Sequence, residues 1–116
     1  MSAREVEPVV VLGLGRFGRS VASALTREGC EVLAIDQDPD LVRLASRMVT
    51  MSVEADVTSK EALEQLGVGE YTRAVVAIGD AMEASLVCAL LLKETFKIPE
   101  IWAKAINADQ AKILRK

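Results

Sequence analysis

The sequence predicts a single α/β domain built on a Rossmann-like, doubly wound parallel sheet. Apolar segments rich in β-branched residues alternate with amphipathic segments, and short turns join them. Apolar residues make up 51% of the chain and aromatic residues only 3%, which suits an aliphatic sheet buried between helices. A length of 116 residues is typical of one domain.

The strongest local signal lies between residues 8 and 36. A strand is expected over 8–12, and the run Gly13-Leu14-Gly15-Arg16-Phe17-Gly18 follows it as a G-x-G-x-x-G. After an amphipathic segment, a second strand is expected over 31–35 and leads into Asp36. Strand, glycine loop, helix, strand and acid form the dinucleotide-binding fingerprint, with the acid about 20 residues after the loop. The alternative is a purely structural glycine turn with Asp36 as an ordinary strand-end carboxylate.

Each part of the fingerprint has a physical role. Gly13 permits a tight turn, Gly15 removes the side chain where a pyrophosphate approaches, and Gly18 lets the helix pack closely. The N-terminus of the helix points free N–H groups at the phosphates. Asp36 is expected to accept hydrogen bonds from the ribose and to repel the 2′-phosphate of NADP.

The remaining elements alternate between helices and strands. Two predicted helices carry apolar side chains at helical spacing, namely Phe17, Val21, Ala24 and Leu25 on the first and Leu41, Leu44, Ala45 and Met48 on the second. Three capping signals are expected: Asp38-Pro39, Thr58 with Glu61, and Asp80 with Glu83. The expected ranges are helix 16–28, a helix from 39, strand 50–53, a helix ending at 67, strand 74–78, a helix through 93, strand 100–104 and a last helix around 107–114.

This pattern and the right-handed crossover rule predict the strand order 3-2-1-4-5. The ligand crevice of such a sheet lies outside the carboxyl ends of strands one and four. The glycine loop, Asp36, Asp56 and the segment from Ile78 through Gly79 to Asp80 should therefore converge there.

Composition excludes several function classes. The net charge is −3 and no basic cluster is visible along the sequence, so nucleic acid is not an expected partner. No apolar run is long enough to span a bilayer or to insert into lipid, and no signal peptide is visible. Histidine is absent, which excludes imidazole acid–base catalysis and the usual zinc sites. Cys30 and Cys88 match no metal spacing and are expected to be buried thiols in a reducing compartment.

The loop Val11-Leu12-Gly13-Leu14-Gly15-Arg16-Phe17-Gly18 resembles that of the RCK (regulator of potassium conductance) or TrkA-N domains, most closely the KtrA-type subunits of Ktr potassium transporters. The resemblance continues through 33–36, 56–58, 75–79 and 90–94, and through Ile101-Trp102-Ala103-Lys104-Ala105, so it covers nearly the whole chain. It implies a cytosolic gating subunit, not an enzyme, that binds ATP, ADP or NAD(H). It further implies homodimers or rings of dimers docked on the inner face of a membrane transporter subunit.

The resemblance also implies residue roles. The three glycines would cradle phosphates, Arg16 would neutralise phosphate charge, Asp36 would bind the ribose, Asp56 and Val57 would border the adenine, and Ile78 and Gly79 would line the opposite wall. The predicted cofactor-binding residues are Gly13, Gly15, Arg16, Phe17, Gly18, Asp36, Gln37, Asp56, Val57, Ile78 and Gly79; no catalytic or metal-binding residue is predicted.

Plainer roles stay open for several of these residues. Arg16 could be a solvated first-turn side chain, Asp56 could only cap a helix, and Asp80 is better explained as an N-cap than as a ligand contact. A competing function is the cofactor domain of an NAD-dependent oxidoreductase, and a third is a Rossmann domain with a vacant crevice.

The end of the chain carries a further expectation. Residues 113–116 stop within an amphipathic pattern, with neither a glycine cap nor a proline beyond it. The family resembled continues into another strand, a crossover helix and often a C-terminal lobe. Residues 1–116 are therefore expected to be the N-terminal nucleotide-binding part of a longer natural chain.

Overall fold

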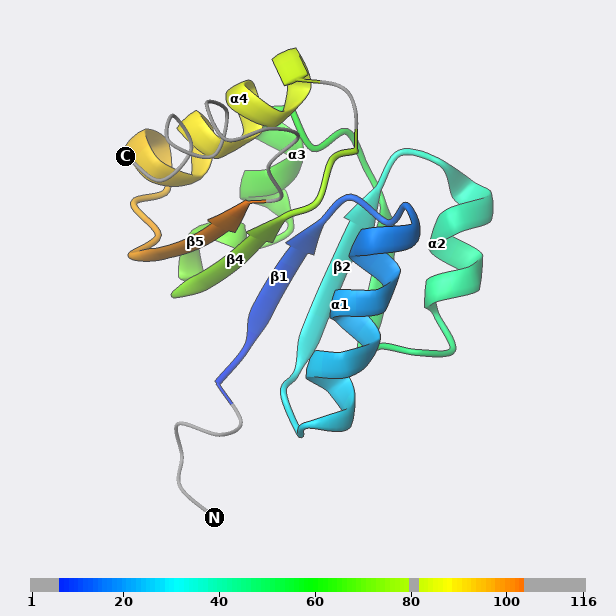
Figure 1. Cartoon of the computed structure of the whole chain (residues 1–116). Coiled ribbons are helices and arrows are strands. Elements are labelled where there is room, and N and C mark those ends of the chain that lie inside the picture. Colours follow the sequence, from blue (N-terminus) through cyan, green and yellow to red (C-terminus); the bar gives the residue numbers. More distant parts are fainter. Residues whose placement is uncertain (1–6, 80–81, 104–116) are drawn as a thin grey trace.

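The structure is a computed structural model that describes residues 7–79 and 82–103 (Figure 1). Its strands form one five-stranded, fully parallel sheet in the order β3-β2-β1-β4-β5, which confirms the predicted topology. The strands are β1 (Val9–Leu12), β2 (Val32–Asp36), β3 (Met51–Glu54), β4 (Arg73–Val76) and β5 (Glu100–Ala103).

Helices cover both faces of this sheet, as the ribbon shows (Figure 1). They are α1 (Arg16–Arg27), α2 (Pro39–Ala45), α3 (Lys60–Gln65) and α4 (Met82–Leu90), with the 3₁₀ turn η2 (Val68–Glu70) and the π-helical segment η3 (Leu91–Thr95). Each crossover between neighbouring parallel strands thus contains at least one helix, as βαβ units require.

The core consists of two layers that share β1. Val9 and Val11 point into one layer, where they join Ala22 of α1 and Ala45 of α2. Val10 and Leu12 point into the other, with Leu63 of α3, Cys88 of α4 and Leu92 of η3. Because successive residues of a strand face opposite sides, burial on both sides requires the unbroken apolar run that the sequence shows.

One of the predicted helix caps, at Asp38, is confirmed, and another, at Thr58, is not. Asp38 caps α2 as expected, because its Oδ1 accepts a hydrogen bond of 2.9 Å from the Asp40 amide and Pro39 follows it. The predicted cap at Thr58 is wrong: Ser59 is the N-cap of α3, and its Oγ accepts from the Ala62 amide at 3.2 Å. Thr58 instead donates its amide and hydroxyl to Asp56.

The expected apolar faces are only partly buried. Phe17 is 40% exposed, although Ala22 on the same helix is fully buried. Leu44 and Met48 are also exposed, and α2 ends at Ala45 before it reaches Met48. The helical spacing predicts these apolar faces. Helix α2, however, is short and lies near the edge of the sheet, so not all of its predicted apolar side chains are buried.

Strand β4 ends at Val76, two residues before the predicted end. Its neighbour β1 turns away at Gly13, so Ala77 makes the last link by donating its amide to the Leu12 carbonyl at 2.7 Å. Helix α4 continues into η3 as far as Thr95, slightly beyond the predicted Lys93. The cap expected at Asp80, the end of the last strand at Lys104 and the helix expected around 107–114 lie outside the described residues.

Glycines end two helices as predicted. Gly29 after α1 has φ +96° and Gly67 after α3 has φ +77°, the left-handed conformation that a helix C-terminus favours. In the part of the chain that the structure describes, no helix is long and apolar enough to cross a membrane.

Candidate functional site

The predicted site residues meet along the carboxyl edge of the sheet. Register pairs Leu12 with Ile35 on one side and with Val76 on the other, so the segments after β1, β2 and β4 lie next to one another. Asp36 pairs in turn with Glu54, which brings the segment after β3 into the same row. The glycine loop is therefore flanked by Asp36 on one side and by 77–79 on the other, as the topology predicted.

Gly13 and Gly18 are required by the fold itself. Gly13 has φ +106°, and a Cβ there would lie 2.5 Å from the carbonyl oxygen of Ala77. A Cβ on Gly18 would lie 1.9 Å from the carbonyl oxygen of Gly13. Both distances are far below van der Waals contact, so these two glycines let the loop, α1 and the end of β4 pack together.

Gly15 differs from both. Its φ is −65°, which any residue adopts, and among the described residues no atom beyond its own chain neighbours and helix backbone lies within 4 Å of the position a Cβ would take. Neither backbone strain nor internal packing explains a glycine here. A ligand that approaches the loop from outside does explain it, and this is the role the fingerprint assigns to the second glycine.

The N-terminus of α1 is open to an anion. Gly15 is its N-cap and supplies no side-chain hydrogen bond, and the first turn carries no acidic residue. The positive end of the helix dipole and its unpaired amides are thus directed at the space above the loop, where a phosphate would lie.

Asp36 binds the loop directly. Its Oδ2 accepts a hydrogen bond of 2.7 Å from the Leu14 amide, and its Oδ1 accepts one of 2.8 Å from the Asp38 amide. A carboxylate oxygen can accept two hydrogen bonds and each oxygen of Asp36 accepts one of these, so one lone pair on each could accept from a ribose hydroxyl. Gln37, between Asp36 and Asp38 in the chain, is exposed. The carboxylate therefore shapes the phosphate loop in addition to the ribose role expected of it.

Asp56 and Val57 form the turn before α3. The Oδ1 of Asp56 accepts from the Thr58 amide at 2.8 Å and from the Thr58 hydroxyl at 2.7 Å. These bonds hold the pKa of the Asp56 carboxyl below its usual value, mainly through the hydroxyl. Val57 packs partly buried against the core layer of α3. Asp56 thus neither caps α3 nor lies free, and its carboxylate organises a local turn.

Ile78 and Gly79 form the opposite wall. Ile78 packs partly buried against the α3–α4 layer, and its carbonyl accepts a long hydrogen bond of 3.5 Å from the buried Ser85 hydroxyl of α4. Gly79 is exposed, and within the described part of the chain no atom beyond its chain neighbours lies within 4 Å of its Cβ position.

Arg16 and Phe17 border different hollows. Arg16 lines a hollow between α1 and α2. Phe17 lines an apolar hollow of about 300 Å³ beside the sheet, together with Trp102 of β5 and with Val21 and Leu25 of α1. Phe17 therefore borders an apolar hollow that does not include Asp36.

Leu14 is a functional residue to which the sequence analysis assigns no role. Its side chain is fully buried, and its amide donates to the Asp36 carboxylate. A large apolar residue between two glycines is the signal that could have revealed this anchor. Among the described residues no group of acidic or cysteine side chains could hold a metal ion.

Cys30 and Cys88 are both buried, as expected. Burial raises the pKa of the Cys88 thiol to about 12, with a smaller contribution from the negative charge of Asp56. Such a thiol stays protonated and unreactive at neutral pH, so it contributes packing rather than chemistry.

Known proteins match this fold and sequence. The chain is 40% identical over 106 residues to Ktr system potassium uptake protein C and 42% identical to protein A of the same system, both of Bacillus subtilis. Each alignment covers 91% of this chain but only 48% and 47% of those relatives, so the chain spans about half their length.

A solved structure agrees with these sequence matches. The Shewanella denitrificans Kef C-terminal domain in its AMP-bound form superposes with a TM-score of 0.71 at 26% identity, over 94% of this chain and 66% of that one. The family model for the TrkA-N domain matches residues 9–116. That match covers nearly every residue from the first strand onwards, and the expected family is thereby confirmed: the chain belongs to the TrkA-N domain family.

Proposed function

We propose that this chain is the nucleotide-binding regulatory domain of a potassium uptake system and that its crevice binds an adenine nucleotide. The observation that carries this proposal is Gly15, whose open surroundings and ordinary backbone leave an external ligand as the reason for a glycine. The names of the matched Ktr proteins support the potassium uptake context, and the AMP-bound Kef domain supports the adenine nucleotide.

The ligand is oriented by groups at the carboxyl edge. Loop amides and the N-terminus of α1 bind the phosphates, and Arg16 neutralises the outermost phosphate charge. Asp36 uses its remaining lone pairs for the ribose, with Gln37 beside it. Asp56 and Val57 border the adenine, and Ile78 with Gly79 close the opposite side. Gly13 and Gly18 keep this frame rigid.

Regulation, rather than catalysis, is the proposed output. A nucleotide can shift a conformational equilibrium only if it binds one arrangement more tightly than the other. ATP and ADP share adenine and ribose, so discrimination between them must come from the terminal phosphate and from Arg16. The chain has no histidine to act as an acid–base group, and the nucleotide is expected to leave the crevice unchanged.

Self-association and membrane recruitment complete the proposal. Helix α4 is apolar on nearly all sides and leaves Met82, Val87 and Leu90 exposed, which supports the proposal that a second copy covers this face in a homodimer or a ring of dimers. An integral-membrane potassium transporter subunit is the proposed partner. The chain would thus act at the inner face of the membrane through a protein contact.

A calorimetric panel of AMP, ADP, ATP, NAD and NADH tests the function. Asp36→Ala is expected to remove adenine-nucleotide binding, because the carboxylate both shapes the loop and binds the ribose. Asp40→Ala removes an exposed carboxylate four residues later and should bind normally. Arg16→Ala should weaken ATP more than AMP. Circular dichroism checks that each variant is folded, and wild-type protein that binds no member of the panel would refute the proposal.

The same crevice would fit the cofactor half of an NAD-dependent oxidoreductase, and one measurement separates the two functions. The full-length natural protein is incubated with NADH and carbonyl compounds as hydride acceptors, or with NAD and alcohols as hydride donors, and the absorbance of the reduced nicotinamide is followed. Turnover would favour the oxidoreductase. Nucleotide-dependent change of the assembly without turnover would favour the regulator.

A further inference from the structure

Helices α1 and α2 enclose a hollow of about 540 Å³ that is rich in arginine. Its lining includes Arg16, Arg19 and Arg27 from α1, two serines of the same helix, and Leu44 and Met48 from the α2 side. A second hollow of about 320 Å³ continues over α2, where it shares Leu44 and adds one acid, Asp40, and two arginines, Arg43 and Arg47. We name this continuous surface the arginine groove. It is assembled from segments that carry no basic cluster in the sequence.

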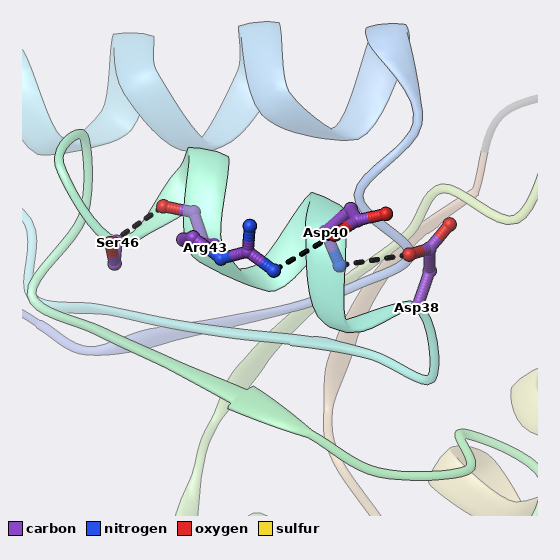
Figure 2. A network of polar contacts seen from close by, with 4 residues as sticks. All are labelled: Asp38, Asp40, Arg43 and Ser46. Atoms are coloured by element: carbon purple, nitrogen blue, oxygen red, sulfur yellow. Dashed lines mark hydrogen bonds and ion pairs between the residues drawn. The ribbon is translucent and has the colours of Figure 1, made fainter.

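The charges in this groove are largely uncompensated. Within residues 7–79 and 82–103, the one ion pair joins Arg43 to Asp40 at 2.8 Å, and both side chains are well exposed (Figure 2). Exposed pairs of this kind contribute little and are readily exchanged. Arg19 and Arg47 have no acidic partner in the described part of the chain. The groove is therefore a concentrated positive surface on a protein of net charge −3.

The dimensions of the groove select an elongated occupant. Arg16 and Arg27 are eleven positions apart on one helix, which corresponds to about 16 Å along its axis. A single phosphate cannot contact both ends, whereas an extended segment of roughly five residues spans that distance. Leu44 is 53% exposed and Met48 is 38% exposed, so the groove also offers apolar contact.

We propose that the arginine groove docks an acidic, leucine-containing peptide segment of a protein partner. Carboxylates would pair with the guanidinium groups, which favour bidentate contacts with them, and an apolar side chain would cover Leu44 and Met48. The net negative charge and the apolar lining disfavour nucleic acid as the occupant. This inference rests on the proposed function for the existence of a protein partner. The groove shares Arg16 with the proposed nucleotide crevice, and its other arginines lie outside that crevice.

The test is a titration of the full chain with a short capped peptide in which glutamates alternate with leucines. Binding is monitored by NMR amide shifts and by calorimetry. Arg19→Glu with Arg27→Glu should lower the affinity at least about tenfold, since two charge-assisted contacts are replaced by like-charge repulsion. Lys60→Glu with Lys97→Glu makes the same change in net charge outside the groove and should lower it less than about twofold. A peptide with glutamine in place of leucine should bind more weakly.

Several results would overturn the proposal. Equal losses in the two charge-reversed variants would show diffuse attraction, and shifts outside α1 and α2 would place the peptide elsewhere. Inorganic phosphate or single-stranded DNA that competes at the peptide's own concentration would assign the groove to a different anion. If the groove variants dissociate a homo-oligomer and the peptide does not bind, the occupant is a second copy of the chain.

AMP binding by the same variants separates this proposal from the function. Arg19 and Arg27 are not in the nucleotide crevice, so both pairs of variants should bind AMP as the wild type does. A wild-type chain that binds AMP but does not bind the peptide would refute the docking surface alone. A wild-type chain that binds the peptide but does not bind AMP would refute the nucleotide site alone.

Discussion

The three glycines of the loop differ in what surrounds them. Gly13 and Gly18 face protein atoms at distances that admit no Cβ, while Gly15 faces open space with an ordinary backbone conformation. A motif that looks uniform in sequence therefore contains two glycines that the fold requires and one, Gly15, that we propose is required by a ligand. The difference can be measured by adding one methyl group at each position.

Gly15→Ala is expected to leave the thermal midpoint within a few degrees of wild type and to weaken AMP binding about tenfold or more, because the new methyl group occupies the space of a phosphate. Gly18→Ala is expected to destabilise the domain by about 1–3 kcal/mol through overpacking against Gly13, a fall of several degrees for a chain of this size. Calorimetry and thermal unfolding on both variants provide the comparison. Equal thermal losses for the two variants would contradict this division.

Asp36 shows how one side chain can join two functions. Its carboxylate binds the Leu14 amide in the loop after β1 and the Asp38 amide at the start of α2. Its replacement must therefore affect loop shape as well as any ribose contact, because a buried or half-buried amide without its acceptor costs about 1–3 kcal/mol. Affinity losses at this position report both effects together.

At the scale of elements, α4 and α3 form the layer that supports the back of the crevice. Cys88 lies fully buried in α4 within the cluster that contains Leu63 of α3 and Leu92 of η3. Its thiol has a pKa raised to about 12 by burial. In the unfolded chain the thiol has a pKa near 9, so the native state holds this proton more tightly.

This difference predicts that alkaline pH destabilises the domain through Cys88. A raised native pKa contributes stability below the unfolded pKa, and that contribution falls as pH rises from about 9 towards 12. The free energy of urea unfolding should drop by about 1.4 kcal/mol more between pH 8 and pH 10 in wild type than in Cys88→Ala. Tyr71, whose pKa burial also raises, affects both proteins alike. Parallel pH profiles for the two proteins would refute the assignment.

At the scale of the whole molecule, apolar surface and charge are distributed unevenly. The exposed apolar side chains of α4 lie on the helix layer opposite α1 and α2, as Figure 1 shows for the helices. The arginine groove lies between α1 and α2. The two faces are thus suited to different partners, an apolar one for a second copy and a basic one for an acidic segment.

The apolar face predicts a specific loss of self-association. Leu90→Glu places a charge on a side chain that is 57% exposed, and it should weaken dimer formation about tenfold or more, because an unpaired charge would be buried in the contact. Met51→Glu changes an equally exposed apolar residue on the edge strand β3 and should have little effect. Sedimentation equilibrium measures both. A monomeric wild type at high concentration would contradict the proposed face.

Much of this architecture could be predicted from the sequence because its causes are local. The unbroken apolar runs of β1 and β2, the glycine motif and the glycine that ends α1 each depend on neighbouring residues. Together with the handedness of crossovers they determined the strand order and the convergence of Gly13, Asp36 and Ile78 at one edge. The resemblance that starts from the glycine loop also predicted the family, and the TrkA-N family model that matches residues 9–116 confirms it.

Other features were decided only by the tertiary structure. The bond from the Leu14 amide to Asp36, the exposure of Phe17 and the gathering of arginines between α1 and α2 each depend on residues far apart in the chain. Spacing along a sequence predicts which face of one element a side chain occupies, whereas its partners depend on how two elements pack. The sequence by itself determined the fold and the edge where a ligand would bind, and packing between elements decided which side chains that edge and its surroundings present.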